Sequence, residues 1–118
     1  MTADRRPRAL VVEDEVLVAM MLEDTLDTLG YAVVGPAHRL RDGLAAVERE
    51  AIDVAVLDVN LDGARSLPIA DALAARGIPF VFATGYGEAG LAGAHPDAPV
   101  VRKPFSIDDI GCALARVR

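Results

Sequence analysis

The sequence predicts an α/β fold of the (βα)5 kind, a doubly wound five-stranded parallel sheet with a short or irregular fourth helix. Short apolar runs of strand character alternate along the chain with segments whose apolar residues recur at helical spacing. Repeated strand–helix units pair their strands in parallel through right-handed crossovers, which puts helices on both faces of the sheet. The stretch after the fourth apolar run is rich in glycine, and it predicts the weak fourth helix.

The size and composition of the chain fit one globular domain. Its 118 residues suffice to bury a core, and 53% of them are hydrophobic. No apolar run approaches the ~20 residues that cross a bilayer, and no apolar signal-peptide segment follows the polar residues 1–8. We therefore expect a cytoplasmic protein without a membrane partner, with a flexible N-terminal tail over residues 1–7 and one domain over residues 8–118.

Charge and cysteine content exclude several classes of protein. The net charge of −6 argues against nucleic-acid binding, because affinity for the phosphate backbone requires clustered Lys and Arg. The acidic residues gather partly at Glu13-Asp14-Glu15 and at Asp58, which points to a cation. The single cysteine, Cys112, rules out an internal disulfide, and its apolar surroundings in the sequence predict a buried, inert thiol.

The first half of the chain predicts two strands and two helices. A β-rich run predicts a strand over residues 8–13, and the helix that follows it stops at Gly30. A second strand over residues 31–34 is closed by Gly35-Pro36, and a second helix follows. The apolar faces of these two helices consist of Val18, Leu22, Leu26 and Leu29, and of Leu40, Leu44 and Val47.

The second half continues the same alternation. The unbroken apolar run 54–57 is typical of a central strand covered on both faces. A third helix ends at Gly77, and further strands are predicted over residues 80–83 and 99–102. Ser106 and the residue three positions on, Asp109, predict a capping box at the start of the last helix. The apolar faces of these helices consist of Leu67, Ile69, Ala70, Leu73 and Ala74, and of Ile107, Ile110, Leu114 and Val117.

Residues 85–98 form the weakest part of the pattern. They contain several glycines and Pro96 but few apolar anchors. Each glycine in a helix costs ~1 kcal/mol relative to alanine. We therefore predict a loop with at most a turn or two of helix.

Four of the predicted strands end on, or next to, a reactive side chain, and the carboxyl ends of parallel strands are where such sheets bind ligands. Clustered carboxylates repel one another and either raise their pKa values or recruit a cation. Mg²⁺ prefers carboxylate and carbonyl oxygens, an ammonium can neutralise phosphoryl charge, and a carboxylate can form an aspartyl-phosphate. The residues concerned are Glu13, Asp14, Asp58, Thr84 and Lys103.

Each of these features also has a structural explanation when it is taken alone. The acidic run Glu13-Asp14-Glu15 suits the first turn of a helix, and Asp58 can open a turn with Asn60 and Gly63. Thr84 can belong to an ordinary strand exit, and Lys103 can belong to a surface turn. Their combination at one predicted sheet edge favours a site for a divalent cation and a phosphoryl group.

The motifs together resemble the receiver domain of two-component response regulators, in the CheY-like superfamily. They are the string Leu10-Val11-Val12-Glu13-Asp14-Glu15, the apolar run into Asp58, Thr84 after an apolar strand, and Lys103-Pro104-Phe105. The resemblance covers the chain from about residue 8, and it implies the flavodoxin-like strand order 2-1-3-4-5. It further implies a phosphorelay switch rather than an enzyme, which accepts a phosphoryl group from a histidine kinase or a phosphotransfer protein and then changes its interaction with an unknown downstream protein.

The resemblance also implies a role for each site residue. Asp58 would be the phosphoacceptor, and the Lys103–Pro104 peptide is often cis in this family. The implied Mg²⁺ ligands are Asp14, Asp58 and the backbone carbonyl of Asn60, with Glu13 acting mostly through water, and the implied phosphoryl contacts are Thr84 and Lys103.

Three departures from the family pattern concern the switch. Most receivers carry Tyr or Phe three positions before the lysine, where this chain has Val100, so the usual pairing of threonine with an aromatic cannot operate. Asp62 replaces a common proline, and the segment between Thr84 and Lys103 is short and glycine-rich.

The string Phe82-Ala83-Thr84-Gly85-Tyr86 resembles the signature of the FATGUY subgroup of receivers. That subgroup lacks the aromatic near the lysine and is typically paired with histidine kinases of the HWE or HisKA_2 type. Tyr86 is therefore a switch candidate together with Val100, although a simple packing role for Tyr86 is nearly as well supported. Our hypothesis is that phosphorylation orders residues 85–98.

Other interpretations stay open at the level of the sequence. A Mg²⁺-dependent phosphohydrolase of the haloacid-dehalogenase type would need Asp-x-Asp after the first strand, and a phosphate-independent interaction module would usually lose part of the acidic set or the lysine. His38 and His95 match no ligand spacing, and we predict loop or surface positions for both. No output domain follows the last helix of this sequence, so we expect a stand-alone receiver.

Overall fold

The computed structural model describes residues 6–61, 64–85 and 95–117, and it contains a five-stranded parallel sheet. The strands run in the order β2-β1-β3-β6-β7, which is the order 2-1-3-4-5 when only the strands of this sheet are counted. The predicted fold class is therefore confirmed. The strands are β1 (Arg8–Val12), β2 (Ala32–Ala37), β3 (Val54–Asp58), β6 (Phe80–Thr84) and β7 (Val100–Arg102).

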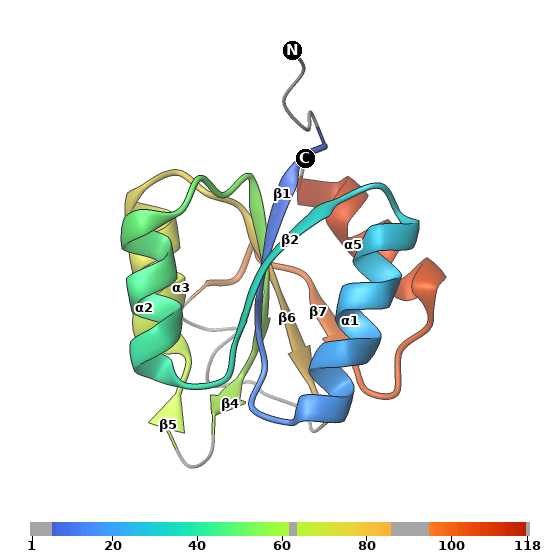
Figure 1. Ribbon diagram of the computed structural model, residues 1–118, viewed down its shortest axis with the longest axis horizontal. Coiled ribbons are helices and arrows are strands. Elements are labelled where there is room, and N and C mark those ends of the chain that lie inside the picture. The colour runs from blue at the N-terminus through green and yellow to red at the C-terminus, as the bar shows by residue number, and fades with distance from the viewer. Residues whose placement is uncertain (1–5, 62–63, 86–94, 118) are drawn as a thin grey trace.

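Helices cover both faces of this sheet (Figure 1). The helices α1 (Val16–Thr28) and α5 (Ile107–Val117) lie on one face, and α2 (Leu40–Arg49) and α3 (Leu67–Ala75) lie on the other. Each face has its own buried cluster: Leu10 and Val12 of β1 belong to the cluster under α2 and α3, while Ala9 and Val11 belong to the cluster under α1 and α5. Burial on both faces explains why the strands are unbroken apolar runs.

The helix boundaries follow local signals that the sequence contains. Gly30 and Gly77 follow α1 and α3 with positive φ values of 95° and 71°, a conformation that favours glycine. At the start of α5, the Asp109 N–H donates to Ser106 Oγ at 3.1 Å and the Ser106 N–H donates to Asp109 Oδ2 at 2.8 Å. This reciprocal pair is the predicted capping box.

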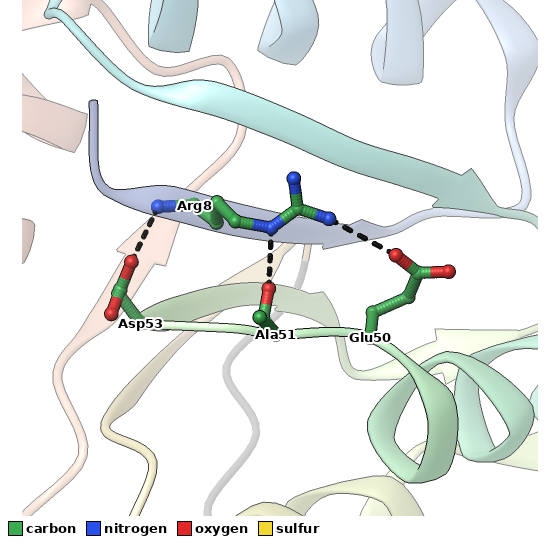
Figure 2. Close-up of polar contacts among 4 residues, drawn as sticks. All are labelled: Arg8, Glu50, Ala51 and Asp53. Atoms are coloured by element: carbon green, nitrogen blue, oxygen red, sulfur yellow. Dashed lines mark hydrogen bonds and ion pairs between the residues drawn. The ribbon is translucent and has the colours of Figure 1, made fainter. Parts of the chain in front are cut away.

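Arg8 ties the start of β1 to the segment that joins α2 to β3 (Figure 2). Its backbone N–H donates to Asp53 Oδ2 at 2.7 Å, and its side chain donates to the Ala51 carbonyl at 2.7 Å and to Glu50 Oε1 at 3.0 Å. These bonds are exposed and individually weak. They fasten the end of the sheet opposite the carboxyl ends of the strands.

Several elements differ from the sequence-based predictions. β2 continues through Gly35 and Pro36, because an edge strand tolerates a proline that donates no hydrogen bond. A small antiparallel pair, β4 (Asn60–Leu61) and β5 (Ala64–Arg65), follows β3 where the sequence indicated only a turn. Cys112 is exposed rather than buried, because the buried face of α5 is formed by its neighbours Ile110, Ala113 and Leu114.

Some predictions fall outside the described residues. These are the predictions for Asp62 and Tyr86 and for most of the glycine-rich segment, including the expected short or irregular fourth helix. Among the helices that the structure describes, none combines the length and the apolar character that crossing a membrane requires.

We expect Gly35→Ala to destabilise the fold more than Gly30→Ala, by about 2 to 4 kcal/mol against about 1 kcal/mol. Both glycines have φ values near +95°, but a Cβ at Gly35 would lie 2.8 Å from the Ala37 backbone nitrogen, whereas a Cβ at Gly30 meets nothing within 4 Å. Urea unfolding measures both losses. Equal losses would show that the close backbone approach at Gly35 carries no cost.

Candidate functional site

The carboxyl ends of four strands bring the predicted site residues to one edge of the sheet, the lower edge in Figure 1. Glu13 and Asp14 follow β1, Asp58 ends β3, Thr84 ends β6, and Lys103 follows β7. Crossover connections join these parallel strands, so residues far apart in the sequence become neighbours. The predicted juxtaposition is confirmed for these five residues.

Three carboxylates lie close together at this edge. Glu13, Asp14 and Asp58 each offer an oxygen atom, and these atoms all lie within 4.8 Å of one another. Glu13 is fully buried and Asp58 is 7% exposed, while Asp14 is half-buried. Burial of like charges at such distances is unfavourable unless a cation or a proton offsets it.

Lys103 supplies one positive charge to this cluster. Its Nζ atom lies 2.7 Å from Glu13 Oε1 and 3.4 Å from Asp58 Oδ2, and its side chain is 17% exposed. The backbone N–H of Lys103 donates to the Thr84 carbonyl at 2.7 Å, which continues the pairing of β6 with β7 and holds the two residues side by side. Thr84 is itself almost completely buried.

The backbone around Glu13 is firmly held. Glu13 Oε2 accepts a hydrogen bond from the Glu15 N–H at 3.1 Å. The Glu13 N–H donates to the Ala37 carbonyl at 2.9 Å, and the Glu13 carbonyl lies 2.8 Å from His38 Nδ1. Both the side chain and the peptide groups of this residue are therefore anchored.

The environment raises the pKa of Asp58 to about 8, from an ordinary value of 3.8. Burial is the largest cause, followed by hydrogen bonds with Glu13 and Asp14 and by the charge of Glu13, while Lys103 acts in the opposite direction. Without a further cation, Asp58 therefore tends to hold a proton at neutral pH. This is the behaviour of a carboxylate in a site that lacks compensating positive charge.

The pKa of Lys103 is shifted upward, so the ammonium stays charged. Burial by itself would lower this pKa, but the hydrogen bond with Glu13 and the charges of Asp58 and Glu13 together outweigh it. Lys103 is thus a permanent cation at the edge of the cluster.

The three carboxylates fit a hard divalent cation. Mg²⁺ is usually held by one or two carboxylates together with water and phosphate oxygens, and a cation here would release the proton that Asp58 retains. The backbone of Asn60 begins β4, two residues beyond Asp58. The donor set and its electrostatics are consistent with the metal site of a phosphoryl-binding domain.

Of the two switch candidates, the structure describes only Val100. Val100 pairs with Phe82 in the sheet, and its side chain is 41% exposed. A valine offers no hydrogen-bonding group to Thr84. Tyr86 lies outside the described residues.

Sequence reasoning missed the contacts of both histidines. His38 and His95 lie outside the helices and strands, as predicted, but both are partly buried and make polar contacts. His38 bonds to Glu13, while His95 Nε2 lies 2.8 Å from Asp71 Oδ1 and its ring meets Phe80 edge-on at a centroid distance of 5.2 Å. No spacing motif marks such contacts, since each joins residues that are far apart in the sequence.

The fold and the site together define an α/β domain of flavodoxin-like strand order, with an acidic cluster and a lysine at the carboxyl edge of its sheet. The sequence profile of the response regulator receiver domain family matches residues 9–115. The chain belongs to this family. A receiver domain is a phosphoacceptor switch rather than an enzyme, so the phosphohydrolase alternative is excluded.

Similar proteins include both single receivers and longer regulators. The solution structure of SdrG from Sphingomonas melonis Fr1 is 49% identical and matches with a TM-score of 0.84 over 94% of this chain and 95% of that chain. The BeF3-activated conformation of SdrG from Pseudomonas melonis Fr1 is 50% identical, with a TM-score of 0.78 over 92% of this chain and 93% of that chain.

Among curated proteins, the phyllosphere-induced regulator PhyR of Methylorubrum extorquens (strain AM1) is 31% identical over 120 residues. The match covers 98% of this chain but only 45% of PhyR, so the chain spans less than half the length of that relative.

We expect the stability of the metal-free protein to fall, relative to Asp58→Asn, as the pH rises from 5 to 9. Folded Asp58 keeps its proton up to a pKa of about 8, whereas the unfolded chain releases it near 3.8, so the stabilisation from the retained proton is lost as the pH rises through the folded value. At pH 9 the variant should be more stable by about 1 to 3 kcal/mol.

Urea unfolding in EDTA at several pH values measures this difference. Asp24→Asn, which changes an exposed aspartate of α1, is the matched control for the loss of one carboxylate. A pH-independent offset for Asp58→Asn would contradict the raised pKa.

Proposed function

We propose that Asp58 is the phosphoacceptor of this receiver domain and that the reaction requires Mg²⁺. The observation that carries the proposal is the position of Asp58 at the end of β3, within the carboxylate cluster and 3.4 Å from the Lys103 ammonium. In the proposed site, Asp14, Asp58 and the Asn60 carbonyl bind the ion, and Glu13 acts mostly through water. A receiver domain implies a histidine kinase as phosphodonor.

The chemistry assigns a definite task to each group. An ionised carboxylate oxygen of Asp58 attacks the phosphorus of a phosphohistidine, so that an O–P bond forms and the P–N bond breaks, and the imidazole leaves. When bound, Mg²⁺ offsets the negative charge of the carboxylates and of the phosphoryl oxygens. Asp58 must lose its proton before it can attack, and the neighbouring ammonium of Lys103 favours that loss.

Thr84 and Lys103 are the proposed contacts to the phosphoryl oxygens. The hydrogen bond between the Lys103 N–H and the Thr84 carbonyl supports a joint role, because it holds a hydroxyl and an ammonium at adjacent strand ends. Lys103 would exchange its contact with Asp58 for one with the phosphoryl group while its contact with Glu13 keeps it in reach.

The family and one sequence motif support the proposed partners. The string Phe82-Ala83-Thr84-Gly85-Tyr86 supports membership of the FATGUY subgroup. The proposed phosphodonor is therefore a histidine kinase of the HWE or HisKA_2 type, or a phosphotransfer protein that such a kinase phosphorylates. A BeF3-activated form of SdrG, at 50% identity, supports the proposal that phosphorylation also changes the conformation of this chain. We place the protein in the cytoplasm, with a downstream protein partner that recognises one of the two states.

Incubation with Mg²⁺ and phosphoramidate should add the mass of one phosphoryl group to the protein. Asp58→Asn should abolish the gain, because the amide is not a nucleophile, and excess EDTA should abolish it in the unaltered protein. Intact-protein mass spectrometry reads both results. Asp24→Asn is the control that should retain the gain, and a persistent gain in Asp58→Asn would mean that another residue accepts the phosphoryl group.

We propose Tyr86 rather than Val100 as the residue that carries the switch. The exposed, apolar side chain of Val100 supports this choice, because it cannot form a hydrogen bond that follows the position of Thr84. Tyr86 lies two residues after Thr84, and the other aromatic at that separation, Phe82, is fully buried in the core.

Tyr86→Ala should still accept a phosphoryl group, but beryllofluoride should then cause smaller NMR chemical-shift changes along β7 and α5. The matched variant Val100→Ala should show the full changes, since the wild-type side chain contributes no polar contact. Undiminished changes in Tyr86→Ala would assign the switch to other residues.

A further inference from the structure

The end of β2 and the residue after it bind both backbone polar groups of Glu13, which belong to two successive peptide units. The Glu13 N–H donates to the Ala37 carbonyl at 2.9 Å, which extends the pairing of β1 with β2 by one residue. The Glu13 carbonyl lies 2.8 Å from Nδ1 of His38, the residue that follows β2. Two successive residues, the last of β2 and the one after it, thus fasten the point where the chain leaves β1 and enters the acidic cluster.

The chemistry of this contact determines the direction of the hydrogen bond. A carbonyl oxygen can only accept, so His38 Nδ1 must carry the proton and donate it. Nδ1 carries a proton in the imidazolium and in one neutral tautomer, so the bond does not require a charged ring. His38 is partly buried, which shields the bond from competing water.

The anchored carbonyl belongs to the peptide that leads into Asp14. A peptide unit is planar, so fixing the Glu13 carbonyl also fixes the direction of the Asp14 N–H and the departure of the Asp14 side chain. The Glu13 side chain is held separately, by the Glu15 N–H and by Lys103. His38 is therefore the described contact that orients this peptide from its carbonyl side.

We propose that His38 is a positioning residue of the cation site, which acts by orienting the Glu13–Asp14 peptide so that the Asp14 carboxylate faces Asp58. This inference rests on the proposed Mg²⁺ function of the cluster. It goes beyond that function by adding a residue that touches neither the ion nor the phosphoryl group. Groups that orient metal ligands commonly change metal affinity by 10- to 100-fold, and a contact one step further away should change it by about threefold to tenfold.

The test compares three substitutions of His38 that differ in where they offer a donor. The asparagine amide can occupy the place of Nδ1, so His38→Asn should keep the bond. His38→Ala removes the donor, and His38→Gln moves it by one bond toward the Nε2 position. The control is His95→Ala, which alters the second of the two histidines, packed against Phe80 far from Glu13 in the sequence.

The first readout uses the metal-free protein. Hydrogen exchange at the Asp14 amide, which shares a peptide with the Glu13 carbonyl, is followed by NMR. It should accelerate in His38→Ala and His38→Gln but not in His38→Asn. The second readout is the Mg²⁺ dissociation constant from an NMR titration, which should rise about threefold to tenfold in the first two variants and stay near the wild-type value in His38→Asn and His95→Ala.

A structural role for the ring alone would give a different pattern, in which all three His38 variants lose stability and none changes the Mg²⁺ dissociation constant selectively. That pattern, or equal affinities in His38→Gln and His38→Asn, would overturn the proposal. If His38→Ala does not fold, the comparison of Gln with Asn decides. Failure of the unaltered protein to accept a phosphoryl group would refute the proposed function, whereas the amide exchange and the Mg²⁺ titration would still report on His38.

Discussion

Burial of negative charge at the carboxyl edge of the sheet is the constraint on which the rest of this structure depends. Glu13 is fully buried and Asp58 nearly so, and this burial, together with the proximity of Glu13 and Asp14, raises the pKa of Asp58 to about 8. Such an arrangement opposes folding unless positive charge or protons offset it. Lys103 provides part of this offset, and two apolar clusters on either side of the sheet supply the stability that tolerates the remainder.

Most of the fold was predictable because its signals are local. Unbroken apolar runs mark the strands, helical spacing marks the helices, and the Ser106–Asp109 capping box marks the start of α5. The errors arose where position in the sheet overrides a local signal. Gly35-Pro36 predicts the end of a strand, but on the edge strand β2 the proline interrupts pairing with no second neighbouring strand. Cys112 lies in an apolar stretch, yet the orientation of α5 turns it outward.

The candidate site was predictable for a different reason, namely that a parallel sheet brings its carboxyl ends together whatever the loops do. Glu13, Asp58 and Lys103 could therefore be placed together from topology alone. Topology does not predict that the Lys103 ammonium lies closer to Glu13, at 2.7 Å, than to Asp58, at 3.4 Å. The contacts of His38 and His95 could not be predicted either, because they depend on the exact path of the loops.

The outward orientation of Cys112 has a practical consequence. It is the only cysteine in the chain and it is exposed on α5, next to the edge strand β7 that carries Val100. A maleimide fluorophore or a nitroxide spin label would therefore attach at a single known position without any engineered mutation. Because helix α5 packs on β6 and β7, both of which lead into the acidic cluster, such a label would provide a spectroscopic reporter of events at the cluster from a residue outside it.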